Sequence, residues 1–331
     1  MKFIAGITLL VVALVLVTGH TVSSAAKSNS IIPGDSKSRK IALVGDLQRT
    51  SIWELVMGRE QNDPERGLIV KSISTDNPAM VILLGDMVFD GSNSFQWDYF
   101  DSLMNPVTEK NIPVKPVIGN HEYWGKRSSN LSFLYKRFPF FRQKTWYAQT
   151  HDSLALIFLN SNHLELSPYE WEEQINWYNN RIYNFQNDPA IKGILVFTHH
   201  PPYTNSLITG DEEEVQEAFL SAFNKSTKTL AFISGHAHTY ERFIINKKTF
   251  IVSGGGGGPR VPLKIGLDSH DDLCKEKSPR PFNYLLAERV NDGVNITVKA
   301  LKKDSKKFYI LENFTIPFNQ NYNTASNVNL K

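Results

Sequence analysis

Short runs of apolar residues, separated by segments with helical periodicity, dominate the pattern of this chain. Residues 41–44, 81–84 and 154–159 are uninterrupted apolar runs of four to six residues. Such runs are typical of strands that are buried on both faces. Residues 191–198 and 230–234 are similar enough to predict two further strands of the same kind.

The segments between these runs place apolar side chains at helical spacing. Phe95, Tyr99 and Leu103, for example, recur on one face of a predicted helix. Alternating strands and helices indicate β-α-β units, whose strands are parallel, and therefore an α/β fold. The predicted helical segments are residues 52–57, 69–73, 95–104, 168–183 and 212–223.

The C-terminal part of the chain has a different pattern. Residues 284–316 alternate and are rich in β-branched residues, and Asn291-Asp292-Gly293 is a hairpin turn signal within them. We expect antiparallel strands here that close a second sheet. Residues 249–253 form another predicted strand, and residues 113–118 one more, whereas residues 131–141 are aromatic-rich and expected to be irregular.

The first 26 residues have the pattern of a secretory signal. Lys2 precedes an uncharged apolar run at residues 3–17, and small residues at 22–26 allow cleavage after Ala25 or Ala26. We expect a secreted or periplasmic protein without stable membrane association. An uncleaved anchor is the alternative, although the run is short for a membrane span.

The remainder of the chain is expected to form one folded region between two loose segments. Residues 27–39 are polar and contain Pro33 and Gly34, which predicts a linker. Residues 40–318 carry the predicted strands and helices of a single domain. Residues 319–331 are rich in asparagine and predict a loose tail.

Composition excludes some partners and some metal ligands, but it says little about the fold. The formal net charge is +3 and there is no dense block of Lys or Arg, which argues against a nucleic-acid partner. Cys274 is the only cysteine, so an internal disulfide is excluded and no thiolate cluster can hold a metal. Any metal site must use carboxylate, amide and imidazole ligands.

Ligand-type residues follow five of the predicted strands. The strand ends carry Asp46, Asp86, Asn120 with His121, His199 with His200, and His236 with His238. Because the carboxyl ends of parallel strands meet at one edge of a sheet, we expect these side chains to converge. Their donor atoms suit a pair of divalent ions, with Asp86 placed to bridge them. On an extended segment, His236 and His238 would point to the same side and serve different ions.

The motifs at these strand ends resemble the ordered motifs of calcineurin-like metallophosphoesterases over about residues 41–317. The sequence at 235–242, Gly-His-Ala-His-Thr-Tyr-Glu-Arg, is most similar to the purple acid phosphatase branch. This resemblance implies a four-layer α-β-β-α sandwich with two mixed sheets flanked by helices. The motifs concerned are Gly45-Asp46, Gly85-Asp86, Gly119-Asn120-His121-Glu122, His199-x-Pro201-x-Tyr203 and Gly235-His236-Ala237-His238.

The same resemblance implies roles for individual residues. One metal would be held by Asp46, Asp86 and His238. The other would be held by Asp86 together with three residues of the later motifs, namely Asn120, His199 and His236. An amide can coordinate only through its oxygen, so the NH₂ group of Asn120 would remain for substrate. His121 would not be a ligand and would face the substrate.

Three departures from the family pattern change these expectations. Phe89 stands where the purple branch has a tyrosinate ligand, so purple colour and a preference for ferric iron are not expected. Gln48 stands where many members have a histidine ligand, and it could coordinate weakly, as in Asp-x-Gln members that cleave nucleotide diphosphates. Ile208 and Thr209 replace a histidine pair of plant purple phosphatases, so substrate recognition should differ.

The resulting hypothesis is an exported phosphoesterase with two divalent or mixed-valence ions of Fe, Mn or Zn. Its substrate is a small-molecule phosphate ester, and an acid-phosphatase-like phosphomonoesterase is favoured. A metal-bridging hydroxide would attack phosphorus while His121 protonates the leaving group. Glu122 would orient His121, and His200 and Tyr203 would contact the leaving group or merely pack in their loop. The alternatives are a phosphodiesterase or nucleotide diphosphatase of the Asp-x-Gln type, and a binding scaffold that has lost catalysis.

Two further features have both a structural and a functional interpretation. The glycine run at 254–258 predicts a tight bend under the metal site, with a phosphate-binding loop as the alternative. Trp97, Trp124 and Trp146 are expected to pack in the core or in loops, and an aromatic substrate wall is the less favoured interpretation.

Overall fold

The computed structural model describes residues 39–126, 131–302 and 306–319. The predicted signal segment at 1–26 lies outside these residues, as do residues 27–38 of the linker and residues 320–331 of the tail. Among the helices of the described residues, none combines the length and the apolar character that crossing a bilayer requires.

The first of two sheets has the strand order β12-β11-β10-β1-β2-β3. Its central strands β1, β2 and β3 are parallel. Strand β10 pairs antiparallel with β1, and β11 and β12 continue from it, each antiparallel to the strand before. The strands are β1 (Lys40–Val44), β2 (Met80–Leu83), β3 (Val114–Pro116), β10 (Asn283–Arg289), β11 (Gly293–Lys302) and β12 (Lys307–Pro317).

The second sheet has the strand order β4-β5-β6-β7-β9-β8. Strands β5, β6, β7 and β9 are parallel, and the antiparallel strands β4 and β8 lie at its edges. The strands are β4 (Tyr147–His151), β5 (Leu154–Phe158), β6 (Gly193–Phe197), β7 (Thr229–Ser234), β8 (Tyr240–Ile245) and β9 (Lys248–Ser253).

The C-terminal strands differ from the prediction in their sheet. The expected antiparallel strands at 284–316 exist, and the turn at Asn291-Asp292 joins β10 to β11. They extend the first sheet rather than closing the second, because β10 pairs with β1 in antiparallel register, Leu43 opposite Leu285. The prediction that they complete the second sheet is therefore wrong, since strand pairing over 240 residues leaves no local signal in the sequence.

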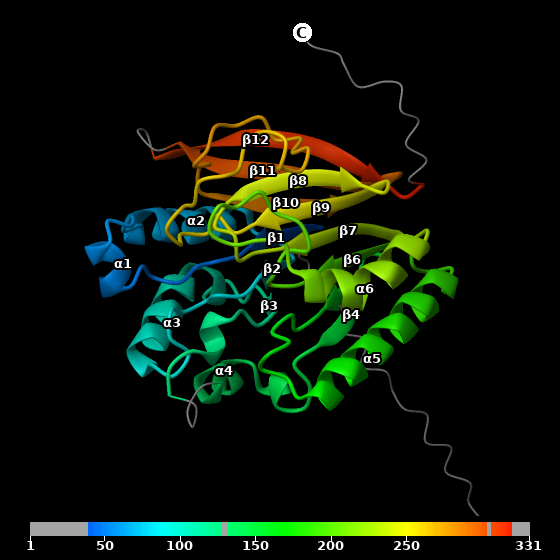
Figure 1. Cartoon of the computed structure of the whole chain (residues 1–331), viewed down its shortest axis with the longest axis horizontal. Helices are drawn as coiled ribbons and strands as arrows, with labels where there is room; N and C mark the ends of the chain where they lie inside the picture. The colour runs from blue at the N-terminus through cyan, green and yellow to red at the C-terminus, as the bar shows by residue number, and fades with distance from the viewer. Residues whose placement is uncertain (1–38, 127–130, 303–305, 320–331) are drawn as a thin grey trace, which may run out of the picture. The chain divides into compact units, whose positions relative to one another are not determined.

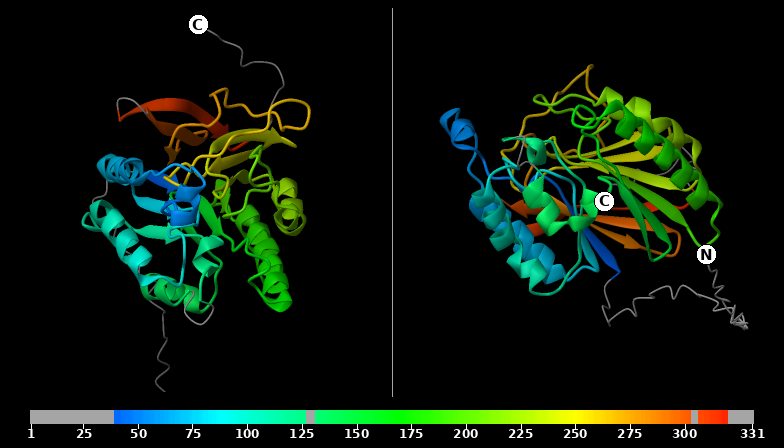
Figure 2. Two further views of the ribbon diagram at one scale, coloured as in Figure 1. Left: turned by 60° about the vertical axis from the view of Figure 1, so that its left-hand side comes forward. Right: turned by 90° about the horizontal axis from the view of Figure 1, so that it is seen from below.

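Helices cover the outer face of each sheet and complete four layers. The right-hand view of Figure 2 shows the blue and cyan helices on one side of the strands and the green helices on the other. Helices α2, α3 and α4 pack on the outer face of the first sheet, and α5 and α6 pack on the second. The helices are α1 (Ile52–Val56), α2 (Asp63–Asp76), α3 (Ser94–Thr108), α4 (Ser132–Arg137), α5 (Pro168–Asn187) and α6 (Glu213–Lys225), with short 3₁₀ helices η1 (His121–Tyr123) and η2 (Pro139–Arg142) (Figure 1).

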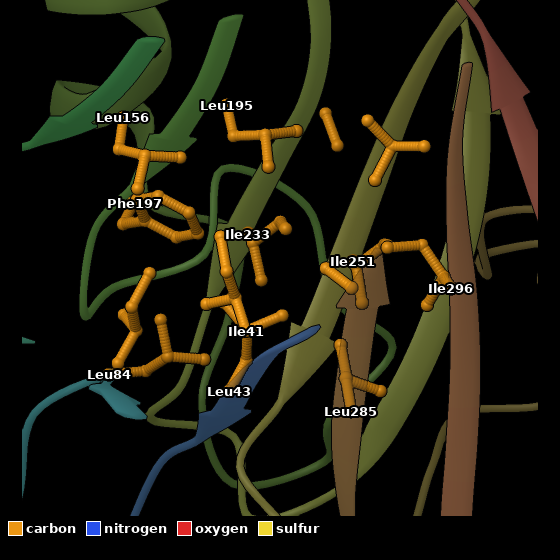
Figure 3. Close-up of a cluster of buried hydrophobic side chains, with 14 of the residues drawn as sticks. Ile41, Leu43, Leu84, Leu156, Leu195, Phe197, Ile233, Ile251, Leu285 and Ile296 are labelled. Atoms are coloured by element: carbon orange, nitrogen blue, oxygen red, sulfur yellow. The ribbon is translucent and has the colours of Figure 1, made fainter. Parts of the chain in front are cut away.

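One hydrophobic core lies between the two sheets. Alternation along β1 sends Ile41 and Leu43 into this core and Ala42 and Val44 toward the helices. Figure 3 shows side chains of both sheets meeting there, with Leu195 and Phe197 contributed by β6. Two sheets buried on both faces explain why the strands appear in the sequence as continuous apolar runs.

Three segments were not predicted correctly from the sequence. Residues 131–141, expected to be irregular, contain α4 and η2. The edge strands β4 and β8 have mixed burial patterns without a continuous apolar run, so the periodicity did not reveal them.

Candidate metal centre

The five strand ends that carry ligand-type residues meet at one edge of the sandwich. Asp46, Asp86 and Asn120 follow β1, β2 and β3 of the first sheet, whereas the histidines follow β6 and β7 of the second. Among the contacts that join the two sheets here, His199 Nε2 lies 3.3 Å from Asp86 Oδ2, and the backbone N–H of His236 donates to Asp46 Oδ2 at 2.9 Å.

One group of donors consists of Asp46, Asp86 and His238, whose ligand atoms lie close enough to share an ion. His238 Nε2 lies 3.4 Å from Asp46 Oδ1. Gln48 is buried beside this group, and its NH₂ can donate to the backbone carbonyls of Asp86 and Asp46 at 3.1 and 3.3 Å. In that orientation Gln48 Oε1 lies 2.9 Å from His238 Nε2, among the metal-ligand candidates.

A second group of donors surrounds His199. Its Nε2 lies 3.0 Å from Asn120 Oδ1 and 3.1 Å from His236 Nδ1. His199, His200 and His236 together offer three imidazole nitrogens within reach of one ion. The sequence predicted Asn120, His199 and His236 for this position, and it placed His200 at the substrate instead.

The ligand-bearing turns have an unusual backbone. Asp46, Asp86, His236 and His238 have φ values of 61°, 53°, 67° and 46°, in the left-handed region that residues other than glycine rarely adopt. The expectation that His236 and His238 lie on an extended segment is therefore wrong. Each still reaches a different donor group, because the tight turn itself directs the side chains. Strained backbone of this kind concentrates at functional sites.

Two glycines make room for the ligands at these turns. A Cβ on Gly85, whose φ is +89°, would lie 2.5 Å from His199 Nδ1, and a Cβ on Gly119 would lie 2.2 Å from Asp86 Oδ1. A side chain at either position would displace a donor. The glycines that precede Asp86 and Asn120 are thus required by the packing of the site.

The glycine run at 254–258 packs against the same turns. The N–H groups of Gly256 and Gly258 donate to the carbonyls of Gly45 and Asp46 at 3.0 and 2.9 Å. Because these amides are already paired within the protein, the tight-bend interpretation describes the run better than a phosphate-binding loop. The buried Arg66 connects the run to the Gln48 turn, donating to the carbonyls of Gly257 and Gln48.

Burial and mutual charge shift the pKa values of the donors in opposite directions. Burial raises the pKa of Asp46. Burial alone would also raise the pKa of Asp86, but the adjacent His199 and His121 hold it well below its ordinary value. Burial opposes protonation of His199, yet Asp86 raises the pKa of His199 to about 9. Burial lowers the pKa of His200 to about 3, so His200 is neutral and available as a ligand or hydrogen-bond partner.

Backbone carbonyls fix the orientation of three imidazoles. His199 Nδ1 lies 2.8 Å from the carbonyl oxygen of Leu84, His238 Nδ1 lies 2.9 Å from that of Pro259, and His121 Nδ1 lies 2.7 Å from that of Phe89. A carbonyl only accepts, so Nδ1 carries the hydrogen in each ring and Nε2 faces the site. This is the usual support for a metal-bound histidine, and the Leu84 and Pro259 carbonyls carry no side-chain signal in the sequence.

Glu122 has a different role from the predicted one. It was expected to orient the His121 ring, but its buried carboxylate accepts hydrogen bonds from the backbone N–H groups of Asp86, Met87, Val88 and Gly119, between 2.8 and 3.3 Å. Burial, and next the charge of Asp86, raise the pKa of Glu122 to about 7. Glu122 therefore positions the turns that carry Asp86 and Asn120.

The remaining predicted residues lie near the centre or beside it. His121 Nε2 lies 3.7 Å from Asp86 Oδ2, at the edge of the donor groups. His200 Nδ1 lies 2.8 Å from the hydroxyl of Ser161, a residue that follows β5 and was not singled out from the sequence. Tyr203 packs edge-on against Phe250 and His270, so its contact with a leaving group stays a prediction.

The sequence did not indicate a third group of possible metal ligands. His163 lies after β5, and its two ring nitrogens are 3.6 Å from carboxylate oxygens of Glu212 and Glu214. Glu214 is half-exposed. The sequence assigned these glutamates only to the start of a helix, and the partnership with His163 depends on the tertiary fold.

The chemistry of the central donors fits a pair of cations. His199 Nε2 has no hydrogen in its neutral form, yet it faces Asn120 Oδ1 and Asp86 Oδ2, which also only accept. Lone pairs directed at one another in a buried site require a proton or a metal ion between them. Carboxylate, amide and imidazole donors suit Fe, Mn and Zn alike. Two sheets, two donor groups and one shared aspartate define a dinuclear metal protein of the α-β-β-α sandwich class.

The comparisons with known proteins give the family. The model of the calcineurin-like phosphoesterase family matches residues 39–240, and the chain belongs to this family of metal-dependent phosphoester hydrolases. The comparison with curated proteins gave no match.

Solved structures share the fold at low sequence identity. A purple acid phosphatase from yellow lupin seeds (Lupinus luteus) is 16% identical with a TM-score of 0.64, over 84% of this chain and 53% of that one. A dimetal phosphatase from Danio rerio is 18% identical with a TM-score of 0.56, over 84% and 98%. GAP50, the anchor in the inner membrane complex of Plasmodium, is 15% identical with a TM-score of 0.62, over 84% and 88%. This chain thus spans about half the length of the lupin structure.

Proposed function

We propose that this protein is an exported phosphatase that hydrolyses small-molecule phosphate monoesters with two metal ions. The observation that carries the proposal is the convergence of carboxylate, amide and imidazole groups from both sheets around Asp86 and His199. One group, Asp46, Gln48, Asp86 and His238, would hold the first ion. A second group, Asp86, Asn120, His199 and His236, would hold the other, with His200 beside it.

When bound, such a pair of ions supplies an activated water and neutralises phosphoryl oxygens. The residues around it provide proton transfer and orientation. Because Nδ1–H of His121 donates to the carbonyl of Phe89, its Nε2 remains for the substrate. Protonated His121 would give the Nε2 proton to the leaving oxygen as the P–O bond breaks, and neutral His121 would result. The NH₂ group of Asn120 would donate to a phosphoryl oxygen.

A phosphodiester or nucleotide diphosphate is the second candidate substrate. Gln48 favours it, because its buried amide oxygen lies among the ligand candidates in the manner expected for Asp-x-Gln members. The two candidates share the metal centre and differ in how many phosphate oxygens carry a substituent.

Turnover of matched substrates tests the proposal. The purified protein, loaded in turn with Mn²⁺, Zn²⁺ or Fe, is assayed with para-nitrophenyl phosphate, its bis ester and a nucleoside diphosphate that is esterified at its terminal phosphate. We expect the monoester to have the highest kcat/KM, and Asp86→Asn to abolish turnover because the shared ligand is lost. Preference for the bis ester or the diphosphate would favour the second candidate. Two bound metals without turnover of any substrate would indicate a binding scaffold.

Export rests on the N-terminal segment and has its own test. We expect the mature protein from an exporting host to begin at Ala26 or Lys27, as read by N-terminal sequencing. Recovery of a chain that retains residues 1–26 in the membrane fraction would contradict cleavage and indicate an anchor.

A further inference from the structure

An aromatic cluster surrounds His121 at the edge of the metal centre. The ring centroids of His121 and Trp124 lie 3.7 Å apart, and those of His121 and Phe89 lie 4.8 Å apart. Phe89 and Trp124 also contact each other edge to face at 5.4 Å. His121 is thus in contact with two aromatic side chains while its Nε2 points toward Asp86.

Trp124 is exposed but held in place. It is 45% exposed, whereas Trp97 and Trp146 are 0% and 4% exposed and belong to the interior. Its backbone N–H donates to the carbonyl of His121 at 3.1 Å, which closes the η1 turn. The next residue, Gly125, has a φ of +92°, and a Cβ there would lie 2.0 Å from Asp90 Oδ1. The backbone of Trp124 and Gly125 is therefore packed against η1 and the Asp90 turn.

The position of Trp124 limits what can bind beside His121. A group that receives a proton from His121 Nε2 must come within hydrogen-bond reach of that atom. The leaving oxygen of a phosphate ester is that group in the proposed function, so the rest of the leaving alcohol extends past the edge of the His121 ring. Trp124, in contact with that ring, offers an exposed apolar surface there.

We propose that Trp124, supported by Phe89, forms a leaving-group subsite that selects phosphate esters whose leaving alcohol carries a planar aromatic ring, such as aryl phosphates or nucleoside phosphates. This inference rests on the proposed function, because the leaving group is placed by the proton donor His121. Indole offers a large flat face to another ring, and stacking of this kind changes binding by about 10-fold. A short aliphatic alcohol covers too little of the indole to gain as much.

The test compares two substrates in three variants. We would measure kcat and KM for 2-naphthyl phosphate and for ethyl phosphate with Trp124→Leu, with Trp124→Phe and with the control Trp53→Leu. Trp53 is 74% exposed on α1 and lies outside the metal centre. Binding of phenylphosphonate and ethylphosphonate, which are not hydrolysed, would be measured by calorimetry in the same variants.

We expect Trp124→Leu to lower kcat/KM for 2-naphthyl phosphate about 10-fold and to weaken phenylphosphonate binding by a similar factor. The ethyl compounds should change less than twofold, Trp124→Phe should recover part of the loss, and Trp53→Leu should resemble the wild type. Equal losses for both substrates would mean that Trp124 only supports His121. No loss for either substrate would mean that Trp124 does not contact the leaving group. Either result would overturn the proposed subsite. If the wild type hydrolyses neither ester, the proposed function fails, and phosphonate binding still decides the subsite.

Discussion

Asp86 connects the parts of the metal centre that come from different strands. Its carboxylate lies 3.3 Å from Nε2 of His199 and accepts the backbone N–H of His121 at 3.1 Å. A carboxylate has two oxygens and can direct one at each ion. An amide has one oxygen and would direct its NH₂ group at the other ion. Asp86 is therefore the residue on which the proposed metal centre depends most.

Gln48 is the weakest predicted ligand, and its replacement by histidine should tighten the first ion. In Gln48→His an imidazole would replace a neutral amide oxygen beside His238. We expect loss of the metal to a chelator to slow by about 10-fold or more. Metal release monitored with a colorimetric chelator measures this. An unchanged release rate would show that residue 48 faces away from the ion.

His121 should affect turnover without affecting metal content. In His121→Asn the proton donor is lost, while the donor groups of both ions remain. We expect kcat to fall about 10²–10⁴-fold, with the same metal-to-protein ratio as the wild type. Elemental analysis and steady-state kinetics on one preparation measure both quantities. Loss of metal in this variant would make His121 a ligand and contradict its assignment as a proton donor.

At the scale of the elements, the strand ends hold the site because a buried acid connects them. Glu122, in η1, accepts N–H groups from the turn after β2 and from Gly119 after β3. Its two oxygens are each shared by two donors, so a single carboxylate fixes the spacing of the strand ends that carry Asp86 and Asn120.

Replacing Glu122 by glutamine should weaken both the fold and the metal site. The NH₂ group of Glu122→Gln would face backbone N–H donors, which leaves two of them without an acceptor. We expect a loss of about 2–4 kcal/mol in the free energy of unfolding and a lower metal content.

A matched control comes from another buried acid. Glu241 accepts one backbone N–H, from Asn205, and the hydroxyl of Thr204, which can rotate to accept instead. Glu241→Gln should therefore cost less than Glu122→Gln in urea denaturation. Equal losses in the two variants would show that Glu122 has no special role in the turns.

The strands and helices that position the site could largely be predicted from the sequence. Strands such as β2 and β6, buried on both faces, require continuous apolar runs, and the helices between them require apolar residues at helical spacing. The order of these elements, together with the ligand-type residue after each strand, indicated the edge at which the site forms.

What the sequence could not indicate depends on tertiary contacts. The pairing of β10 with β1, the Leu84 and Pro259 carbonyls behind His199 and His238, and the partnership of Glu122 with four N–H groups all join distant segments. Backbone carbonyls and N–H groups occur at every residue, so composition and spacing do not distinguish those that orient a ligand. Trp124 was likewise expected to pack in the core or in a loop, because the sequence does not show which side chains the fold leaves exposed.

At the scale of the molecule, the metal centre lies where the two sheets meet, so it also connects them. Asp46 and Asp86 come from the first sheet and the histidines from the second, and the donors Asp46, Asp86 and His199 are at most 1% exposed. Without a cation, two buried carboxylates lie close together, which is unfavourable. Metal binding should therefore stabilise the whole fold.

Removal of the metals should lower the unfolding temperature. A ligand present at 1,000 times its dissociation constant adds about 4 kcal/mol of stability, which corresponds to a shift of about 10 °C for a domain of this size. Calorimetry before and after chelation, and again after metal is restored, measures the shift. An unfolding temperature that is independent of metal would mean that the ions do not connect the sheets.

The most direct test of the dinuclear centre is anomalous diffraction from crystals of the metal-loaded protein. We predict two peaks about 3.5–4 Å apart, with Asp86 between them. One peak should lie beside Asp46, Gln48 and His238, and the other beside Asn120, His199 and His236. A single peak, or no peak at these residues, would contradict the claim that a shared aspartate joins two metal ions.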